Sequence, residues 1–145
     1  MTTLELSDLL AAAVKARDRA YAPYSHFAVG AAVRAPDGRV FTGANAENAS
    51  LGLSMCAERV AIYHALSEGV RQFEAVGVAG PDGMLAMPCG ACRQVLHEFG
   101  PGMQVVFDGG GGLRAVPLQS LLPEAFVGET LEAFSADGVT GREAR

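Results

Sequence analysis

The sequence contains no tryptophan, few charged residues and no long apolar run. Charged residues make up 19% of the chain and hydrophobic residues 50%, which favours a folded core over a disordered segment. Apolar stretches such as 27–33 are far shorter than the ~20 residues that a membrane-spanning helix requires. The N-terminus lacks the basic start and the apolar core of a secretory signal peptide. We therefore expect a cytoplasmic protein without a membrane partner.

Positive charge is also scarce. Eleven lysine and arginine residues stand against sixteen aspartate and glutamate residues, the formal net charge is −5, and the basic residues form no run. Nucleic-acid backbones attract basic patches, so we expect no nucleic-acid partner and a small-molecule substrate instead. The length of 145 residues is typical of one domain, so residues 1–145 are expected to form a single domain. Patterning is weak after Phe126, and we expect the tail over 127–145 to be mobile.

Hydrophobic periodicity predicts the helices and strands. Apolar residues recur at steps of three and four from Leu6 to Ala20, which predicts a helix that ends before Pro23. Thr2 and Glu5 have the spacing of a capping box at its start. Two further helices are predicted over about 55–68, with Ser54 as N-cap, and over 89–99. A helical turn is predicted near Leu121. Strands are predicted over 29–35, 39–44, 73–79, 103–108 and 113–118.

Turn sequences and strand composition indicate how these elements are arranged. The residues 36–38, Pro-Asp-Gly, suit a tight hairpin, and the four glycines of 109–112 are too short a connection for anything but antiparallel neighbours. The near-continuous apolar run 73–79 is typical of a strand covered on both faces. Helices interleaved with about five strands predict an α/β fold, a three-layer sandwich in which a mixed five-stranded sheet carries helices on both faces.

All three cysteines fall into two short patterns, Cys56-Ala57-Glu58 and Pro88-Cys89-Gly90-Ala91-Cys92. An odd number of cysteines disfavours a disulfide framework. Each pattern opens a predicted helix, where unpaired N–H groups and partial positive charge lower the pKa of a thiol. Three thiolates from two helix starts can bind one zinc ion and leave its fourth position open, as in a catalytic zinc site.

The expected charge of the metal site identifies two further candidate site residues next to Cys56, namely Glu58 and Arg59. A zinc ion with three thiolates carries a charge of −1, and Glu58 adds another, so the neighbouring Arg59 is expected to offset charge at a ligand sulfur. An electron-rich thiolate set weakens zinc as a Lewis acid, which makes a general base beside the bound water more valuable. Glu58 lies within the same helical turn as Cys56, and we expect it to be that base.

Three other interpretations remain open at this point. A redox dithiol would use Cys89 and Cys92 but leave Cys56 unexplained. A structural site with three cysteines and one histidine would draw its fourth ligand from His26, His64 or His97. Outside the cysteine pattern, Glu58 and Arg59 would be ordinary solvated helix charges.

Together, 56–59 (Cys-Ala-Glu-Arg) and 88–95 (Pro-Cys-Gly-Ala-Cys-Arg-Gln-Val) resemble the small, homotetrameric, zinc-dependent cytidine deaminases. Zinc deaminases are known to combine a three-cysteine site, a Pro-Cys-x-x-Cys pattern and a glutamate that is not a ligand. The similarity extends to 22–30, 43–50 and 121–126, and so covers about residues 20 to 126.

The resemblance implies an activity and an assembly. The activity is hydrolytic deamination of cytidine and 2′-deoxycytidine to the uracil nucleosides, a step of pyrimidine salvage, with one zinc ion per subunit of a homotetramer. The assembly places residues of more than one subunit around each active site. The implied roles are zinc ligation by Cys56, Cys89 and Cys92, proton transfer by Glu58, ribose binding by Asn45 and Glu47, stacking on the base by Phe27, a backbone hydrogen bond from Ala57 to the pyrimidine carbonyl, and a contribution of Phe126 to a neighbouring subunit's site.

Four residues depart from the common pattern of this family. Leu51 replaces a frequent tyrosine, Ala44 a cysteine, Val60 a threonine and Met87 a serine. These departures bear on specificity and on contacts between subunits rather than on the type of reaction. The alternatives are a deaminase of another aminopyrimidine nucleoside, such as blasticidin S, and a non-catalytic structural zinc module. The ribose-binding pattern of Asn45 and Glu47 favours a plain nucleoside.

Overall fold

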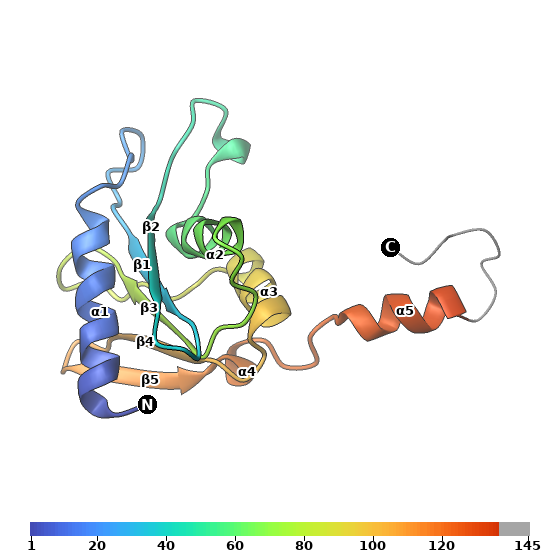
Figure 1. The fold of residues 1–145 in the computed structure, drawn as a ribbon. Helices are drawn as coiled ribbons and strands as arrows, with labels where there is room; N and C mark the ends of the chain where they lie inside the picture. Colours follow the sequence, from blue (N-terminus) through green and yellow to red (C-terminus); the bar gives the residue numbers. More distant parts are fainter. Residues whose placement is uncertain (137–145) are drawn as a thin grey trace.

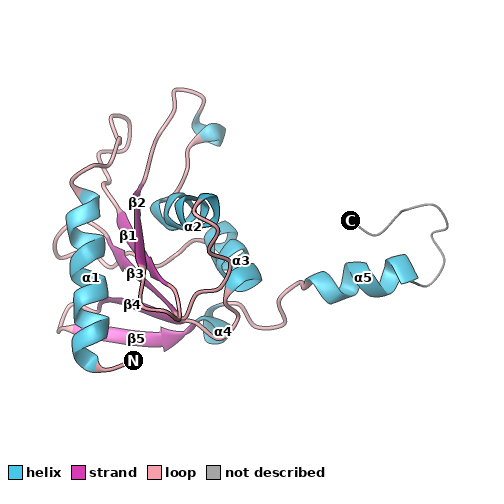
Figure 2. Ribbon diagram, in the orientation of Figure 1, coloured by secondary structure: helices cyan, strands magenta, loops and turns pink. Residues whose placement is uncertain are grey.

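The computed structural model describes residues 1–136 and contains the mixed five-stranded sheet that the sequence predicts (Figures 1 and 2). The strand order is β2-β1-β3-β4-β5, in which β3 and β4 are parallel and the other neighbours are antiparallel. The three-layer fold class is therefore confirmed. The strands are β1 (Gly30–Arg34), β2 (Val40–Ala44), β3 (Ala75–Ala79), β4 (Gln104–Asp108) and β5 (Leu113–Pro117).

One face of the sheet is covered by α1 (Thr3–Arg17) (Figure 1). The capping box is present, since Thr2 Oγ1 accepts from the Glu5 amide at 3.1 Å and Glu5 Oε2 accepts from the Thr2 amide at 2.7 Å. Leu9 and Ala13 are buried in a cluster with Ala32 and other sheet residues. Burial of this apolar stripe fixes α1 to the sheet.

The other face is covered by α2 (Ala57–Ser67) and α3 (Gly90–Phe99), which enclose the larger core cluster. Ile62 and Leu96 are fully buried there with strand residues such as Val76. A Cβ atom at Gly43 of β2 would lie 2.4 Å from the Ala61 nitrogen. Because such a contact is impossible for any other residue, glycine allows α2 to lie directly on the sheet, and this fixes the position of its first turn.

Two predicted helix boundaries are wrong. The first helix ends at Arg17 rather than near Ala20, because Tyr21 instead pairs with the loop after β2: its amide donates to Asn45 O at 2.9 Å. The N-cap of α2 is Cys56 and not Ser54, which follows the 3-10 helix η1 (Leu51–Leu53) as its C-cap. Tertiary contacts, rather than local capping preference, select both boundaries.

The C-terminal region contains the expected turn of helix, α4 (Leu118–Leu121), and a helix that was not predicted, α5 (Gly128–Ala136). The latter projects away from the sheet and its helices (Figure 1). The expected mobility of 127–145 stays a prediction, and residues 137–145 lie outside the described residues. Within residues 1–136, no helix is both long and apolar enough to cross a membrane.

Candidate active site and metal centre

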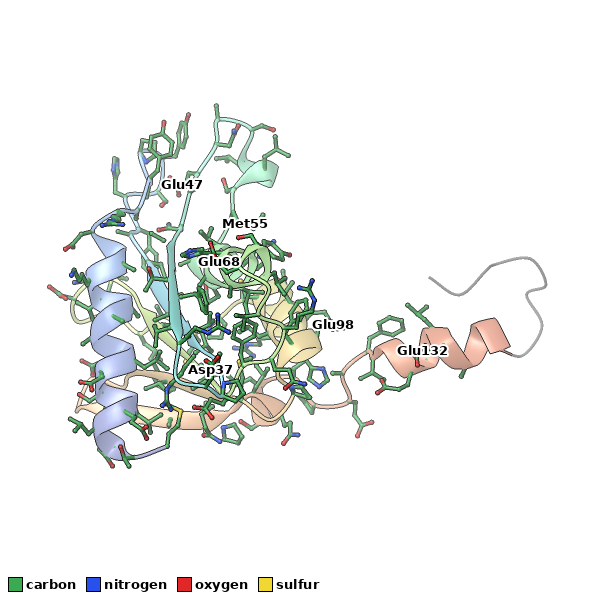
Figure 3. The ribbon with its side chains drawn as sticks, viewed as in Figure 1. Asp37, Glu47, Met55, Glu68, Glu98 and Glu132 are labelled. Atoms are coloured by element: carbon green, nitrogen blue, oxygen red, sulfur yellow. The ribbon has the colours of Figure 1, made fainter. Side chains whose placement is uncertain are left out.

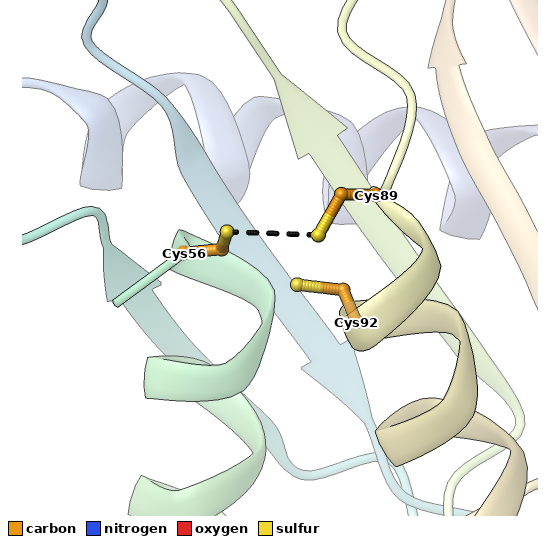
Figure 4. Close-up of side chains that lie close together, drawn as sticks. All are labelled: Cys56, Cys89 and Cys92. Atoms are coloured by element: carbon orange, nitrogen blue, oxygen red, sulfur yellow. Dashed lines mark hydrogen bonds between the residues drawn. The ribbon is translucent and has the colours of Figure 1, made fainter. Parts of the chain in front are cut away.

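The N-termini of α2 and α3 meet at one end of the sheet and bring the three cysteines together (Figure 4). Cys56 and Cys89 are the N-cap residues of the two helices, both with extended backbone, and Cys92 lies in the first turn of α3. Figure 4 shows the sulfurs of the two helices facing a common gap. The predicted convergence of two helix starts is therefore observed.

The spacing of the sulfurs fits a zinc ion. All three Sγ atoms lie within 4.8 Å of one another, and Cys56 Sγ is 3.8 Å from Cys89 Sγ. Ligands about 2.3 Å from a tetrahedral zinc ion are separated by about 3.8 Å. Within residues 1–136, the group of potential metal ligands consists of these cysteines alone and includes no histidine. This arrangement disfavours a closed site with three cysteines and a histidine, and His64 instead pairs through Nδ1 with Thr42 O at 3.1 Å.

Glu58 lies beside the cysteine cluster and is buried, with only 4% of its surface exposed. Its Oε2 atom is 3.8 Å from Cys92 Sγ. Burial raises the pKa of this carboxyl group above its ordinary value, and the charge on Cys56 acts in the same direction. A carboxyl group of this kind can hold and release a proton under conditions where a solvated glutamate stays ionised.

Arg59 supports the negative charge of the cluster. Its Nη2 atom donates to Cys56 Sγ at 3.4 Å. Hydrogen bonds from Cys92 and then from Arg59 lower the pKa of Cys56 to about 5, whereas the pKa of Cys92 is raised, first by its hydrogen bond to Cys56 and then by burial. The thiolate in turn raises the pKa of the Arg59 guanidinium. The cluster thus holds negative charge beside a permanent cation, as the charge accounting predicts.

A cavity of about 390 Å³ opens from the cluster toward solvent. This volume is in the range of small-molecule sites. The cavity brings together seven of the residues singled out from the sequence and excludes Phe126, whose side chain is 58% exposed elsewhere on the chain. The seven are Phe27, Asn45, Glu47, Cys56, Ala57, Glu58 and Cys89.

Asn45 and Glu47 at the outer side of the cavity organise the loop that carries Phe27. Asn45 Oδ1 accepts from the Val29 amide at 2.8 Å, and Asn45 Nδ2 donates to Phe27 O at 2.8 Å. Glu47 Oε1 accepts from the Tyr24 and Ser25 amides at 3.0 and 3.1 Å. Hydrogen bonding to Ser25, first to its side chain and then to its amide, lowers the pKa of the carboxyl group. Figure 3 shows Glu47 beyond the end of β2, opposite to the Asp37 hairpin. The two polar side chains are thus fixed in place at the mouth of the cavity.

Sequence reasoning missed one wall of the cavity. Val78 of β3 and the residues 85–87 of the loop between β3 and α3 line it, together with Ser25 and Val29. The sequence position of 85–87 could have identified this wall, because these residues directly precede Pro88 and Cys89, and a segment that leads into a metal ligand must lie close to the metal site. Met87 was noted in the sequence only as a departure from a family pattern.

Comparison with known proteins agrees with this geometry. Residues 4–108 match the family model described as the cytidine and deoxycytidylate deaminase zinc-binding region. The chain is 46% identical over 125 residues to a cytidine deaminase of Halalkalibacterium halodurans, covering 85% of this chain and 95% of that protein. It is also 46% identical over 114 residues to a cytidine deaminase of Mycobacterium tuberculosis, covering 79% and 84%. The chain therefore belongs to the zinc-binding cytidine deaminase family.

Solved structures show the same fold. The crystal structure of cytidine deaminase from Burkholderia pseudomallei superposes with a TM-score of 0.78 at 48% identity, covering 87% of this chain and all of that one. A cytidine deaminase from Bacillus anthracis that is only 18% identical superposes with a TM-score of 0.69. The sheet and its flanking helices are thus those of cytidine deaminases, and the cofactor that fits the cysteine cluster is zinc.

Proposed function

We propose that the chain catalyses the zinc-dependent hydrolytic deamination of cytidine and 2′-deoxycytidine to uridine and 2′-deoxyuridine, with release of ammonia. The observation that carries this proposal is a buried carboxyl group, Glu58, 3.8 Å from a sulfur of a three-cysteine cluster at the inner end of an open cavity. Family membership supports the same reaction. The activity belongs to pyrimidine salvage, and we place it in the cytoplasm.

Cys56, Cys89 and Cys92 would hold the zinc ion, and Arg59 would offset the charge of the thiolates through its hydrogen bond to Cys56. When bound, zinc supplies a Lewis acid that lowers the pKa of a water molecule in its open position. The two helix N-termini add partial positive charge around the sulfurs. These features together would stabilise the negative charge of three thiolates and a carboxylate at a site where Cys92 and Glu58 are buried.

Glu58 would move the protons of the reaction. It would take one proton from the attacking water, whose oxygen bonds to C4 of the base, and deliver it to N3. It would then carry the remaining proton of the new C4 hydroxyl to the departing amine. The C4–N bond breaks, ammonia leaves, and the oxygen remains as the C4 carbonyl of uracil. The raised pKa of Glu58 suits this role because the group must accept and donate a proton in the same turnover.

The outer half of the cavity would recognise the nucleoside. Asn45 and the Oε2 atom of Glu47 would hydrogen-bond the ribose hydroxyls, while Glu47 Oε1 holds the Tyr24 and Ser25 amides. Phe27 would cover one face of the pyrimidine, and the Ala57 amide would donate to the C2 carbonyl oxygen. Ala57 is fully buried at the first position of α2. Its N–H therefore has no hydrogen-bond partner within the helix and a fixed direction, so it can donate to a ligand.

The same site would be completed by assembly into a homotetramer. Leu51, Leu53 and Phe126 are 67%, 70% and 58% exposed in the single chain, and exposed apolar groups of this size mark contact surfaces. Gln94 Nε2 donates to Phe126 O at 2.9 Å, which holds the backbone of the segment while the ring stays outside. We therefore place Phe126 in the active site of a neighbouring subunit.

A direct assay tests the activity. Purified protein is incubated separately with cytidine, 2′-deoxycytidine, cytosine and blasticidin S, and loss of the exocyclic amine is followed by absorbance and by ammonia release. Turnover of the two nucleosides with little turnover of free cytosine is the expected result, because cytosine lacks the ribose that Asn45 and Glu47 bind. Preferential turnover of blasticidin S would replace the proposal with the related activity, and turnover of none would favour a structural zinc module.

A further inference from the structure

One wall of the active-site cavity is formed by the loop between β3 and α3, which we define as the wall loop, residues 80–87. Leu85, Ala86 and Met87 of this loop line the cavity with Val78 at the end of β3. Cys56, Ala57 and Glu58 line it from the start of α2. Since the wall loop leads into Cys89, it approaches the site from the α3 side, which faces the α2 side across the sulfur gap (Figure 4).

The proposed reaction fixes which edge of the base meets the wall loop. C4 must lie at the sulfur cluster, and N3 must lie toward Glu58 to receive its proton. In a pyrimidine ring, N3 and C5 flank C4 on opposite sides. The C5 edge of the base therefore points away from α2 and toward the wall loop. This step rests on the proposed function, because it uses the proton path of Glu58.

The side chains that meet this edge are apolar. Val78 is almost fully buried, Met87 is half-buried, and Leu85 forms the outer part of the wall. Such a surface offers little hydrogen bonding to a polar substituent, which would lose its water without compensation. An unbranched methionine can adjust its shape to a small apolar group. The wall thus accommodates a hydrogen atom, a methyl group or a halogen better than a hydroxyl-bearing group of similar size.

The wall loop is held in place from the far side of the sheet. Arg17, in the last turn of α1, donates through Nη1 to Gly80 O and lies 3.0 Å from Asp82 Oδ1. Behind the loop lies a second cavity of about 370 Å³, lined by α1 residues and by 80–86. Because space is available on that side, the loop could shift toward α1 if this anchor were removed.

Gly80 also contributes to the position of the wall. A Cβ atom at Gly80 would come 2.7 Å from Ala86 Cβ, so the two ends of the loop approach each other closely. The Arg17 side chain is mostly buried, whereas Asp82 is 95% exposed. The bond to the Gly80 carbonyl, rather than the solvated ion pair, is therefore the anchor that matters.

We propose that the wall loop, positioned by Arg17, determines which pyrimidine 5-substituents the enzyme accepts, admitting small apolar groups and rejecting polar ones. This role goes beyond the deamination proposed above, which uses neither the wall loop nor Arg17. Leu85 and Met87 are specificity-determining residues that would touch the substrate, and Arg17 is a positioning residue that acts through Gly80.

The first test compares kcat/KM for cytidine, 5-methylcytidine and 5-hydroxymethylcytidine on the zinc-loaded protein. We expect 5-methylcytidine to be deaminated efficiently and 5-hydroxymethylcytidine to be about 10-fold or more slower than it, the effect of burying one uncompensated hydroxyl. Equal values for the two modified substrates would overturn the inference while leaving the proposed function intact. Failure to deaminate cytidine itself would overturn the proposed function, and the inference with it.

The second test changes the polarity of the wall at constant size. Met87→Gln should raise the rate on 5-hydroxymethylcytidine relative to 5-methylcytidine by about 2- to 10-fold, the effect of one new hydrogen bond. Met84→Gln is the matched control, because Met84 is 56% exposed and lines the second cavity. Leu85→Gln, at a 58% exposed position that tolerates polarity, provides a second variant should Met87→Gln misfold. The proposal is contradicted if the ratio of the rates on 5-hydroxymethylcytidine and 5-methylcytidine changes no more in Met87→Gln and Leu85→Gln than it does in Met84→Gln.

The third test separates positioning from general stabilisation. Arg17→Met keeps the aliphatic stem and removes the donor to Gly80 O, whereas Asp82→Asn removes only the exposed ion pair. We expect Arg17→Met to raise KM for 5-methylcytidine several-fold more than KM for cytidine, and Asp82→Asn to leave both values unchanged. A purely structural role would lower the melting temperature and the active fraction but leave the ratio between substrates unaltered, and that result would refute the positioning role.

Discussion

The inner and outer halves of the cavity are built in different ways. The inner half consists of Cys56, Glu58, Cys89 and Cys92 at two helix starts, and both Glu58 and Cys92 are buried by the packing of α2 and α3 on the sheet. The outer half consists of side chains from loops, and Phe126, its expected partner from another subunit, is 58% exposed. The chemical groups are therefore assembled within one chain, while substrate recognition, as proposed above, would depend on loops and on a second copy.

This difference has a physical cause. Helix N-termini are held rigidly by core packing, and Gly43 lets the first turn of α2 rest directly on β2. Loop residues such as Asn45 and Glu47 must instead be fixed by individual hydrogen bonds to neighbouring backbone amides. We expect substitutions in the inner half to abolish catalysis and those in the outer half to weaken binding by graded amounts.

The largest expected effect is loss of the metal on removal of a buried ligand. Cys92→Ala should reduce zinc content and deaminase activity to background, because two thiolates alone leave a zinc site incomplete. Metal analysis and the cytidine assay on the same sample measure both. Ala91→Ser, an exposed change in the same helical turn, is the control and should keep both properties. Full zinc content in Cys92→Ala would show that the ligand set is wrong.

The next largest effect separates proton transfer from metal binding. Glu58→Gln keeps the size of the side chain but removes the titrating group, so kcat should fall by about 10²- to 10⁴-fold while zinc is retained. Glu68→Gln, at the solvent-exposed C-cap of the same helix, should have little effect. Undiminished kcat would make Glu58 an ordinary buried carboxyl group, and loss of zinc would make it a ligand.

A smaller effect is expected in the outer half. Asn45→Ala removes hydrogen bonds to Val29 N and Phe27 O and a proposed ribose contact, so KM for cytidine should rise by about 10-fold or more. Zinc content should remain unchanged, in contrast to the inner-half variants. Steady-state kinetics with Asn48→Ala as a control from the same loop provide the comparison. An effect confined to kcat would contradict a binding role.

The smallest effect is expected at the subunit junction. Phe126→Ala should raise KM several-fold and weaken the tetramer, while zinc content stays at one ion per chain. Light scattering and kinetics at several protein concentrations measure both quantities. Leu4→Ala, another exposed apolar residue, 71% exposed on α1, is the control. A fully active monomer at micromolar concentration would refute both the tetramer and the shared site.

The sequence points to the inner half of the cavity and, through the family resemblance, to Phe27, Asn45 and Glu47 of the outer half, but it does not point to the wall formed by β3 and the wall loop. Cys56, Glu58, Cys89 and Cys92 are close in sequence to two helix starts, so local spacing determines their chemistry. The wall residues Val78 and Leu85 reach the cavity only through the course of β3 and the loop after it, which periodicity does not reveal. The N-cap of α2 was misplaced at Ser54 because capping preference favours serine over the cysteine that the tertiary structure selects.

Helix α5 is an element that the sequence did not predict. The helix Gly128–Ala136 projects away from the sheet and its helices (Figure 1). Amphipathic periodicity is a signal of packing within one chain. Patterning after Phe126 was interpreted as weak, so no helix was predicted over these residues.

Zinc K-edge X-ray absorption on protein purified without chelator tests the central claim most directly. The account predicts one zinc ion per chain, with three sulfur ligands at about 2.3 Å and one oxygen ligand at about 2.0 Å. A fourth sulfur or a histidine nitrogen in place of the oxygen would close the site to water. That result would contradict the proposal that this cavity catalyses a hydrolysis.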